Sequence, residues 1–197
     1  MEIAEITKKR IKEYFAKGFR FDQRKLMEFR NISIETNVSK KAEGSARVRI
    51  GETEVLAGVK LGLAMPFSDS PELGVLMVSA ELSPLASEKF ERGPPSIEAV
   101  ELARIIDRGI RESELIDLSK LCIVPGEKVW ALFLDIYPVN DAGNLIDASA
   151  LACLAALKNA VFPELIDNEK INHGVFTKNK LPLSGNFPFT ITFYKIG

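Results

Sequence analysis

The spacing of hydrophobic residues along the chain changes repeatedly between the period of a strand and the period of a helix. Within residues 31–63 apolar and polar positions largely alternate, as Ala46, Val48 and Ile50 show, which is typical of strands buried on one face. The predicted helices are 2–17, 95–114 and 148–160, and the predicted strands are 31–38, 45–50, 53–63, 73–82, 121–124, 128–139 and 187–194. This order predicts an α+β fold of two layers, formed as a single domain over residues 1–197.

The two later helices differ in how their apolar residues are distributed. Helix 148–160 is apolar almost all round, so we expect it to be the central buried helix, with small alanines that allow close approach to a sheet. Asp147 precedes it and is a typical N-cap residue. The stretch 163–186 is polar and contains glycine and proline, which predicts a loop. The apolar face of helix 95–114 is predicted to consist of Ile97, Val100, Ala103, Ile106 and Ile110.

Helix 95–114 also places three arginines on one narrow stripe. Steps of four and seven residues put Arg104, Arg108 and Arg111 within about 60° of each other around the helix axis. One interpretation is a solvated face with ion pairs, because Asp107 is spaced to reach Arg104 and Arg111. The other is a grip on the phosphates of a nucleic acid, which guanidinium groups bind well.

The composition narrows the possible functions. The 197 residues contain 26 Lys and Arg against 27 Asp and Glu, so any binding of nucleic acid must come from a local patch. Cys122 and Cys153 lie in apolar runs and read as buried small residues in a reducing compartment. His173 has no neighbours at the spacing of metal ligands, so no metal or cofactor is predicted. The charged N-terminus and the lack of a long apolar run predict a cytoplasmic protein that does not enter a membrane.

Three further groups of residues could support chemistry. The loop 141–147 joins a strand to a helix N-terminus, where phosphates are often held, but Leu145, Ile146 and Asp147 oppose an anion, so we interpret it as a turn and a cap. The alternating charges of Arg20-Phe-Asp-Gln-Arg24 suit a surface network or an interface clamp. Gly44 is expected to serve a bulge or a close approach of backbones. No nucleophile triad, P-loop or dinucleotide motif is present in the sequence.

Motifs spread over residues 10–196 resemble the RNase PH-like proteins, and more narrowly the non-catalytic RNase PH-like ring subunit of the archaeal exosome. The motifs are Arg20-x-Asp22-x-Arg24, Phe29-Arg30, Ala42-Glu-Gly-Ser-Ala46, Gly51-x-Thr53-x-Val55, Pro84-Leu-Ala86, Phe90-Glu-x-Gly-Pro-Pro95, Glu101-Leu-Ala-Arg-x-x-Asp-Arg108 and Val124-Pro-Gly-x-x-Val129. The resemblance implies the RNase PH fold and a ring of three heterodimers, each pairing this subunit with an active sister. It also implies cap subunits and single-stranded RNA, degraded from its 3′ end with inorganic phosphate, as partners.

The resemblance further implies that this chain lacks the catalytic groups of the sister. The active sister holds phosphate with a loop of the form Asp-Gly-Gly-Thr-Arg, which matches Asp141, Ala142, Gly143, Asn144 and Leu145 here. Its RNA-gripping Arg-Arg pair matches Ile97 and Glu98. Without these groups phosphorolysis should be lost.

What this chain should contribute, by the same resemblance, is contact with RNA. The family's RNA-binding helix arginines match Arg104 and Arg108, whereas Arg111 is a candidate from its spacing alone. Family members also continue with further strands and a helix that this chain lacks. The chain could therefore be a fragment, be completed by another polypeptide, or have a trimmed fold. Two other functions stay open, a phosphorolytic exoribonuclease active by itself and a free-standing RNA-binding or scaffold protein.

Overall fold

The computed structural model describes residues 4–167 and 169–196, with only the backbone of residue 173. The chain forms two compact units, one drawn from Met1–Asn31 and Thr192–Gly197 and the other from Ile32–Ile191. In the first unit, helix α1 (Glu5–Ala16) is followed by Gly18, whose positive φ of 82° suits a residue without Cβ. The predicted helix 2–17 is confirmed over its described part.

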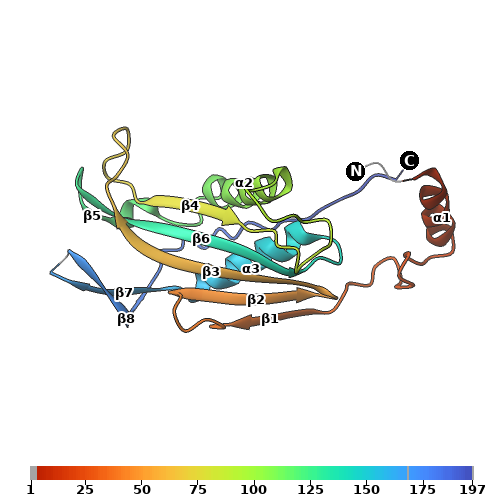
Figure 1. The fold of residues 1–197 in the computed structure, drawn as a ribbon, viewed down its shortest axis with the longest axis horizontal. Helices are drawn as coiled ribbons and strands as arrows, with labels where there is room; N and C mark the ends of the chain where they lie inside the picture. The colour runs from red at the N-terminus through yellow and green to blue at the C-terminus, as the bar shows by residue number, and fades with distance from the viewer. Residues whose placement is uncertain (1–3, 168, 197) are drawn as a thin grey trace. The chain divides into compact units, whose positions relative to one another are not determined.

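The second unit is built on a six-stranded sheet (Figure 1). Its path runs β1-β2-β3-β6-β4, and β5 pairs with β6 beside that path. The pairs are antiparallel except β4 with β6, which is parallel. The strands are β1 (Ile32–Thr36), β2 (Gly44–Ile50), β3 (Thr53–Ala64), β4 (Val75–Ala80), β5 (Cys122–Val124) and β6 (Lys128–Asn140). A short 3-10 helix, η1 (Leu118–Leu121), leads into β5.

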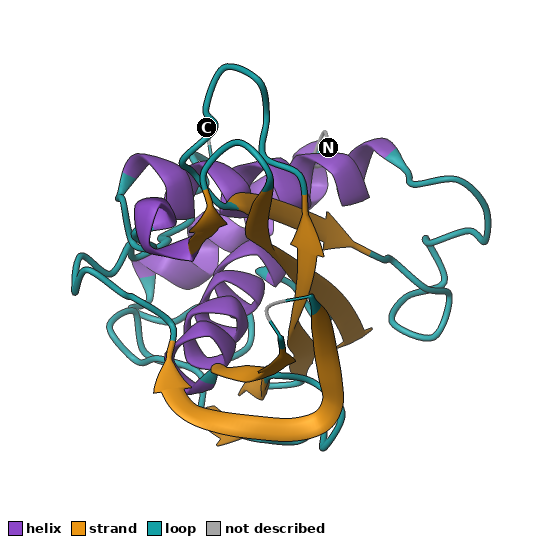
Figure 2. Cartoon of the chain, turned by 90° about the vertical axis from the view of Figure 1, so that its left-hand side faces the viewer, coloured by secondary structure: helices purple, strands orange, loops and turns teal. Residues whose placement is uncertain are grey.

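Two helices, α2 (Ile97–Glu112) and α3 (Leu145–Asn159), cover one face of this sheet (Figure 2). Helix α3 packs against β2 and β3, while α2 packs against β4 and touches α3. The covered face comes from strict alternation: every second residue of β3 from Thr53 to Leu61 is buried. The α+β fold and the central buried helix predicted from the sequence are confirmed.

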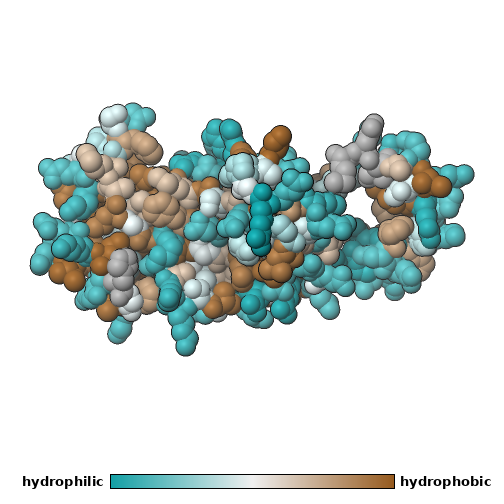
Figure 3. Space-filling model, viewed as in Figure 1, coloured by the Kyte–Doolittle hydropathy of each residue, from teal (hydrophilic) through white to brown (hydrophobic). Residues whose placement is uncertain are grey.

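The segment predicted as a loop over residues 163–186 forms a hairpin instead. Strands β7 (Val161–Ile166) and β8 (Lys170–Lys180) pair antiparallel in a second sheet of two strands. The prediction was wrong because most of this hairpin is exposed, so its residues alternate weakly, and its register shifts at Pro163. Hydrophobic side chains of the hairpin, including Val175 and Phe176, remain exposed. Figure 3 shows hydrophobic side chains on the surface at this end of the molecule.

The predicted strand 187–194 is also wrong, because the described residues of this segment pair with no strand. Its alternating Phe187, Phe189, Ile191 and Phe193 side chains are exposed. An alternating pattern makes a segment suited to a sheet, but a strand needs a hydrogen-bonded neighbour to form.

The structure also corrects the start of α3 and the face of α2 that packs on the sheet. Helix α3 begins at Leu145 rather than Ala148, and its N-cap is Asn144 in the left-handed conformation, with a φ of 61°. Asp147 therefore lies within the first turn, where its charge still favours the helix dipole. The face of α2 that packs on the sheet consists of Ala99, Leu102, Ile106 and Ile110, whereas Ile97 and Val100 point away from the core.

Candidate nucleic-acid interface

The predicted arginine stripe lies on the outer side of α2. The helix begins after Ser96, whose hydroxyl accepts a hydrogen bond from the Ala99 backbone N–H at 3.3 Å. Burial of Leu102, Ile106 and Ile110 fixes the rotation of the helix on the sheet. The arginines are consequently turned toward solvent, and the structure brings all three together along one surface of α2.

Of the three arginines, Arg111 makes the most hydrogen bonds within the protein. Its Nε donates to both carboxylate oxygens of Asp107 at 2.9 Å, and a terminal nitrogen donates to the Leu76 carbonyl at 2.6 Å. Because Leu76 belongs to β4, this guanidinium ties the end of α2 to the edge of the sheet. Much of its donor capacity is therefore occupied within the protein.

Arg108 and Arg104 retain more of their donors. Arg108 contacts Glu112 at 3.1 Å, a surface pair of exposed side chains that contributes little stability. Within the part of the chain that the structure describes, the Arg104 side chain makes no hydrogen bond or ion pair. Arg104 is thus the arginine of the stripe best prepared to bind an external anion.

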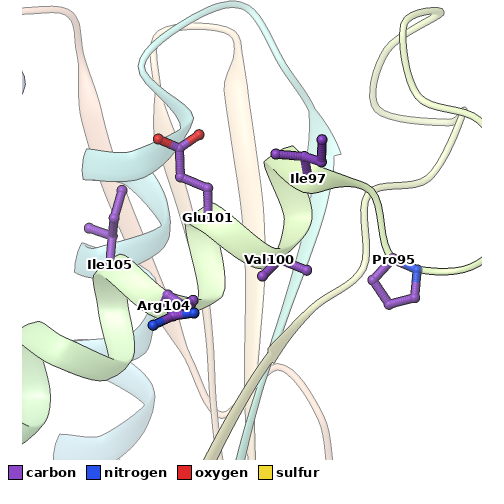
Figure 4. A pocket seen from close by; sticks show the side chains of 6 residues that line it. All are labelled: Pro95, Ile97, Val100, Glu101, Arg104 and Ile105. Carbon is purple, nitrogen blue, oxygen red and sulfur yellow. The ribbon is translucent and has the colours of Figure 1, made fainter.

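Two shallow depressions meet at Arg104. One, of about 450 Å³, is lined by Arg104, Asp107, Arg108 and Arg111. The other, of about 580 Å³, is mostly apolar and is shown in Figure 4. Its lining residues are Pro95, Ile97, Val100, Glu101, Arg104 and Ile105. This second depression was not predicted from the sequence, because Ile97 and Val100 were expected to lie in the core.

The start of α2 carries a negative charge. Hydrogen bonds from its own backbone N–H and then from Ser96 lower the pKa of the Glu98 carboxyl. The carboxylate therefore satisfies donors at the helix N-terminus that an external anion would need. At this position the chain repels phosphate rather than binding it.

The loop before α3 is closed by hydrogen bonds within the protein. The Ala142 N–H donates to Thr53 Oγ1 at 3.1 Å, and the Gly143 N–H donates to Asp141 Oδ1 at 3.0 Å. The Asn144 side-chain amide donates to Asp147 at 2.8 Å. These donors are the groups that could have held a phosphate, so the interpretation as a turn agrees with the geometry. Thr53, which lies far away in the sequence, could not be found from any local signal.

The charged motif at residues 20–24 shapes a loop of the first unit. Arg20 donates to the Leu26 carbonyl at 2.7 Å, and Arg24 pairs with Asp22 at 2.7 Å and donates to the Glu28 carbonyl. Hydrogen bonds with Arg24 lower the pKa of Asp22, against an opposing contribution from desolvation, which is the largest single effect. The motif thus forms a surface network of hydrogen bonds and ion pairs, which is one of the two arrangements predicted from its alternating charges.

Within the part of the chain that the structure describes, the remaining candidates do not form a chemical site; the His173 side chain lies outside that part. Burial raises the pKa of the Cys153 thiol, which leaves this side chain unreactive, and Cys122 is half-buried and unpaired by a disulfide. Among the described residues, no group of three or more His, Cys, Asp or Glu side chains could hold a metal ion. A search of the same residues finds no helix with the length and apolarity needed to cross a membrane.

The sequence of this fold matches one family of proteins. Residues 28–163 match the model of the 3′ exoribonuclease family, domain 1 (RNase PH). The chain belongs to this RNase PH family.

Similar proteins include two named Exosome complex component Rrp42. The one from Methanocella arvoryzae is 49% identical over 195 residues, which are 99% of this chain and 72% of the relative. The one from Thermococcus kodakarensis is 45% identical over 199 residues, which are 100% of this chain and 73% of the relative.

Solved structures give the same picture. An Archaeoglobus fulgidus exosome with RNA bound to the active site has a chain that is 47% identical, with a TM-score of 0.81. The match covers 91% of this chain and 68% of the other. A chain of an archaeal exosome core is 44% identical with a TM-score of 0.73, over 91% of this chain and 66% of the other.

Proposed function

We propose that this chain is a non-catalytic ring subunit of an exosome complex. In this role it positions single-stranded RNA for degradation from the 3′ end by an active RNase PH-like sister subunit, and it acts in the cytoplasm beneath cap subunits. The proposal depends on two observations: Arg104 is exposed and has no partner among the described residues, and the Ala142 and Gly143 N–H groups of loop 141–147 are already hydrogen-bonded within the protein. Similarity to relatives named as exosome components supports it.

The RNA contact in this proposal is made by Arg104 and Arg108. Both lie on the outer side of α2, one helical turn apart, and both line the charged depression. A guanidinium fork can bind two oxygens of one phosphate, and such contacts do not depend on base sequence. Arg111 was predicted as an RNA contact from its spacing alone, and its bonds to Asp107 and Leu76 favour a role in holding α2 instead.

The absence of catalysis follows from what the phosphate loop would need. A phosphorolytic site must orient an attacking phosphate and neutralise its charge. Here the loop backbone is bonded to Thr53 and Asp141, and Leu145 stands where the resemblance places an arginine. Glu98 adds a negative charge at the start of α2. We further propose that residues 1–197 work as one RNase PH-like domain, since relatives match almost the whole chain.

The activity test compares this chain alone, the sister alone, and the two mixed. We expect no phosphate-dependent degradation of a single-stranded RNA by this chain alone, and a rate with the sister above that of the sister by itself. Degradation by this chain alone would show that it is an enzyme and would refute the proposal of an inactive subunit.

The RNA-positioning role is tested with Arg104→Glu in the assembled ring. Loss of one phosphate contact should weaken binding and reduce the dependence of log affinity on log salt by about one unit of slope. Lys178→Glu on β8 is the control, because it reverses an exposed charge away from α2. Unchanged affinity and slope in the Arg104 variant would refute the role.

A further inference from the structure

Arg104 is the shared wall of two depressions with opposite chemistry. On one side lie charged side chains, Asp107, Arg108 and Arg111, and on the other lie the aliphatic side chains of Ile97, Val100 and Ile105. Figure 4 shows the apolar depression along the first half of α2, with Arg104 at its edge. A ligand that fits both sides must carry a negative charge and an apolar surface close together.

The aliphatic side chains that line this depression do not belong to the hydrophobic core. Ile97 is 84% exposed, Val100 45% and Ile105 37%, whereas the opposite side of α2 is buried against the sheet. The helix is therefore apolar on two sides, although one apolar side is enough to dock it. Branched aliphatic residues are also no better than polar ones at forming a helix, so propensity does not explain them.

The lining residues fall on two neighbouring ridges of the helix, each with steps of four residues. Ile97, Glu101 and Ile105 form one ridge, and Val100, Arg104 and Arg108 form the other. Along the second ridge an apolar side chain is followed by two guanidinium groups. Glu101 beside the apolar end repels phosphate, so an anionic group is directed toward Arg104 and Arg108.

We infer that the apolar depression seats a nucleobase of single-stranded RNA whose phosphate is held by Arg104. A nucleotide has the required character, since its flat base is largely apolar on its faces and its phosphate is anionic. The depression has a mainly apolar lining with a few polar groups, a composition that is common in sites for small ligands. This inference rests on the proposed function, and it adds a contact that does not depend on charge.

The test uses Val100→Gln in the ring assembled with the sister subunit, because glutamine keeps the helix propensity and removes the apolar contact. We expect affinity for a single-stranded RNA to fall roughly fivefold, the effect of losing part of the burial of one aliphatic side chain. The salt dependence should stay unchanged, since no ionic contact is lost. Ile97→Gln is the second variant, and Met77→Gln, at an exposed position of β4, is the control.

A set of RNAs that each lack one base identifies the group in the depression. With the unmodified ring, removal of one particular base should weaken binding as much as Val100→Gln does. In the Val100→Gln ring the removal of that base should have no further effect. If every such RNA responds equally in both rings, no base is seated in the depression and the inference is overturned.

Other outcomes of the same experiments would also overturn the inference. If Val100→Gln lowers the mass of the assembled ring, a neighbouring subunit occupies the depression. If it changes the salt slope, it acts through the phosphate contact. If Arg104→Glu leaves RNA affinity and its salt dependence unchanged, the proposed RNA-positioning role itself is refuted. If Arg104→Glu weakens RNA binding as expected but Val100→Gln does not, only the base subsite is refuted.

Discussion

The hydroxyl of Thr53 donates a hydrogen bond to the Gly143 carbonyl oxygen at 2.7 Å and ties the first residue of β3 to the loop that precedes α3. The Thr53 hydroxyl oxygen in turn accepts a hydrogen bond from the Ala142 N–H at 3.1 Å. Thr53 is fully buried, so these bonds are shielded from water on one side. The Thr53 side chain thus binds both an N–H donor and a carbonyl acceptor of the loop and holds the loop closed.

Replacing Thr53 with valine keeps the shape of the side chain and removes both hydrogen bonds. We expect the free energy of unfolding to fall by about 2 kcal/mol, because two backbone groups lose a buried partner. Urea unfolding would measure the difference. Thr36→Val is the control, since Thr36 is exposed on edge strand β1 and should change stability by less than about 0.5 kcal/mol. Equal unfolding midpoints for Thr53→Val and the unmodified protein would show that these two hydrogen bonds do not stabilise the loop.

The contact between β2 and α3 depends on the absence of a side chain at Gly44. A Cβ there would overlap the Ala156 carbonyl oxygen and lie 2.7 Å from the Ala160 Cβ. We expect Gly44→Ala to lower the free energy of unfolding by about 2 kcal/mol, since a packed backbone must shift to accept it. Gly58→Ala is a matched control within β3, where a Cβ would meet nothing within 4 Å. A similar loss in both variants would mean that strand propensity, rather than the close approach, sets the cost.

The strongest periodic patterns gave the correct elements. In β6 the alternation of Trp130, Leu132, Leu134 and Ile136 is realised as a buried row, because a strand in a covered sheet has no other way to place them. Helix α3 could be predicted to lie centrally because it is apolar almost all round, and such a helix must be buried on most sides. Gly44 was expected to serve a bulge or a close approach of backbones; the structure shows the close approach, to Ala156 and Ala160, which could not be known from the sequence.

The errors share a physical cause: the pattern of residues in one element does not show which other element those residues pack against or bond to. The apolar residues of α2 occupy two sides, and only packing against β4 decides that Leu102 is inside and Ile97 outside. The hairpin β7–β8 is mostly exposed, so hydrophobic alternation was too weak to reveal it. For the arginine stripe, the sequence placed the residues on one surface correctly, but the partner of Arg111 is a backbone carbonyl of β4, which no sequence pattern encodes.

Replacing Arg111 or Arg104 with alanine should therefore have different effects on stability and on RNA binding. Arg111→Ala removes the bonds to Asp107 and to the Leu76 carbonyl, so we expect the free energy of unfolding to fall by about 1 kcal/mol, a value discounted for the partial exposure of the side chain. Arg104→Ala should change stability by less than about 0.5 kcal/mol.

The RNA affinity of the assembled ring should show the reverse order, with the larger loss in Arg104→Ala. Urea unfolding and titration of a labelled single-stranded RNA at two salt concentrations would measure the two properties on the same variants. If Arg111→Ala weakened RNA binding as much as Arg104→Ala while its stability stayed unchanged, Arg111 would be a direct RNA contact. The division of the stripe into a structural arginine and RNA-facing arginines would then be wrong.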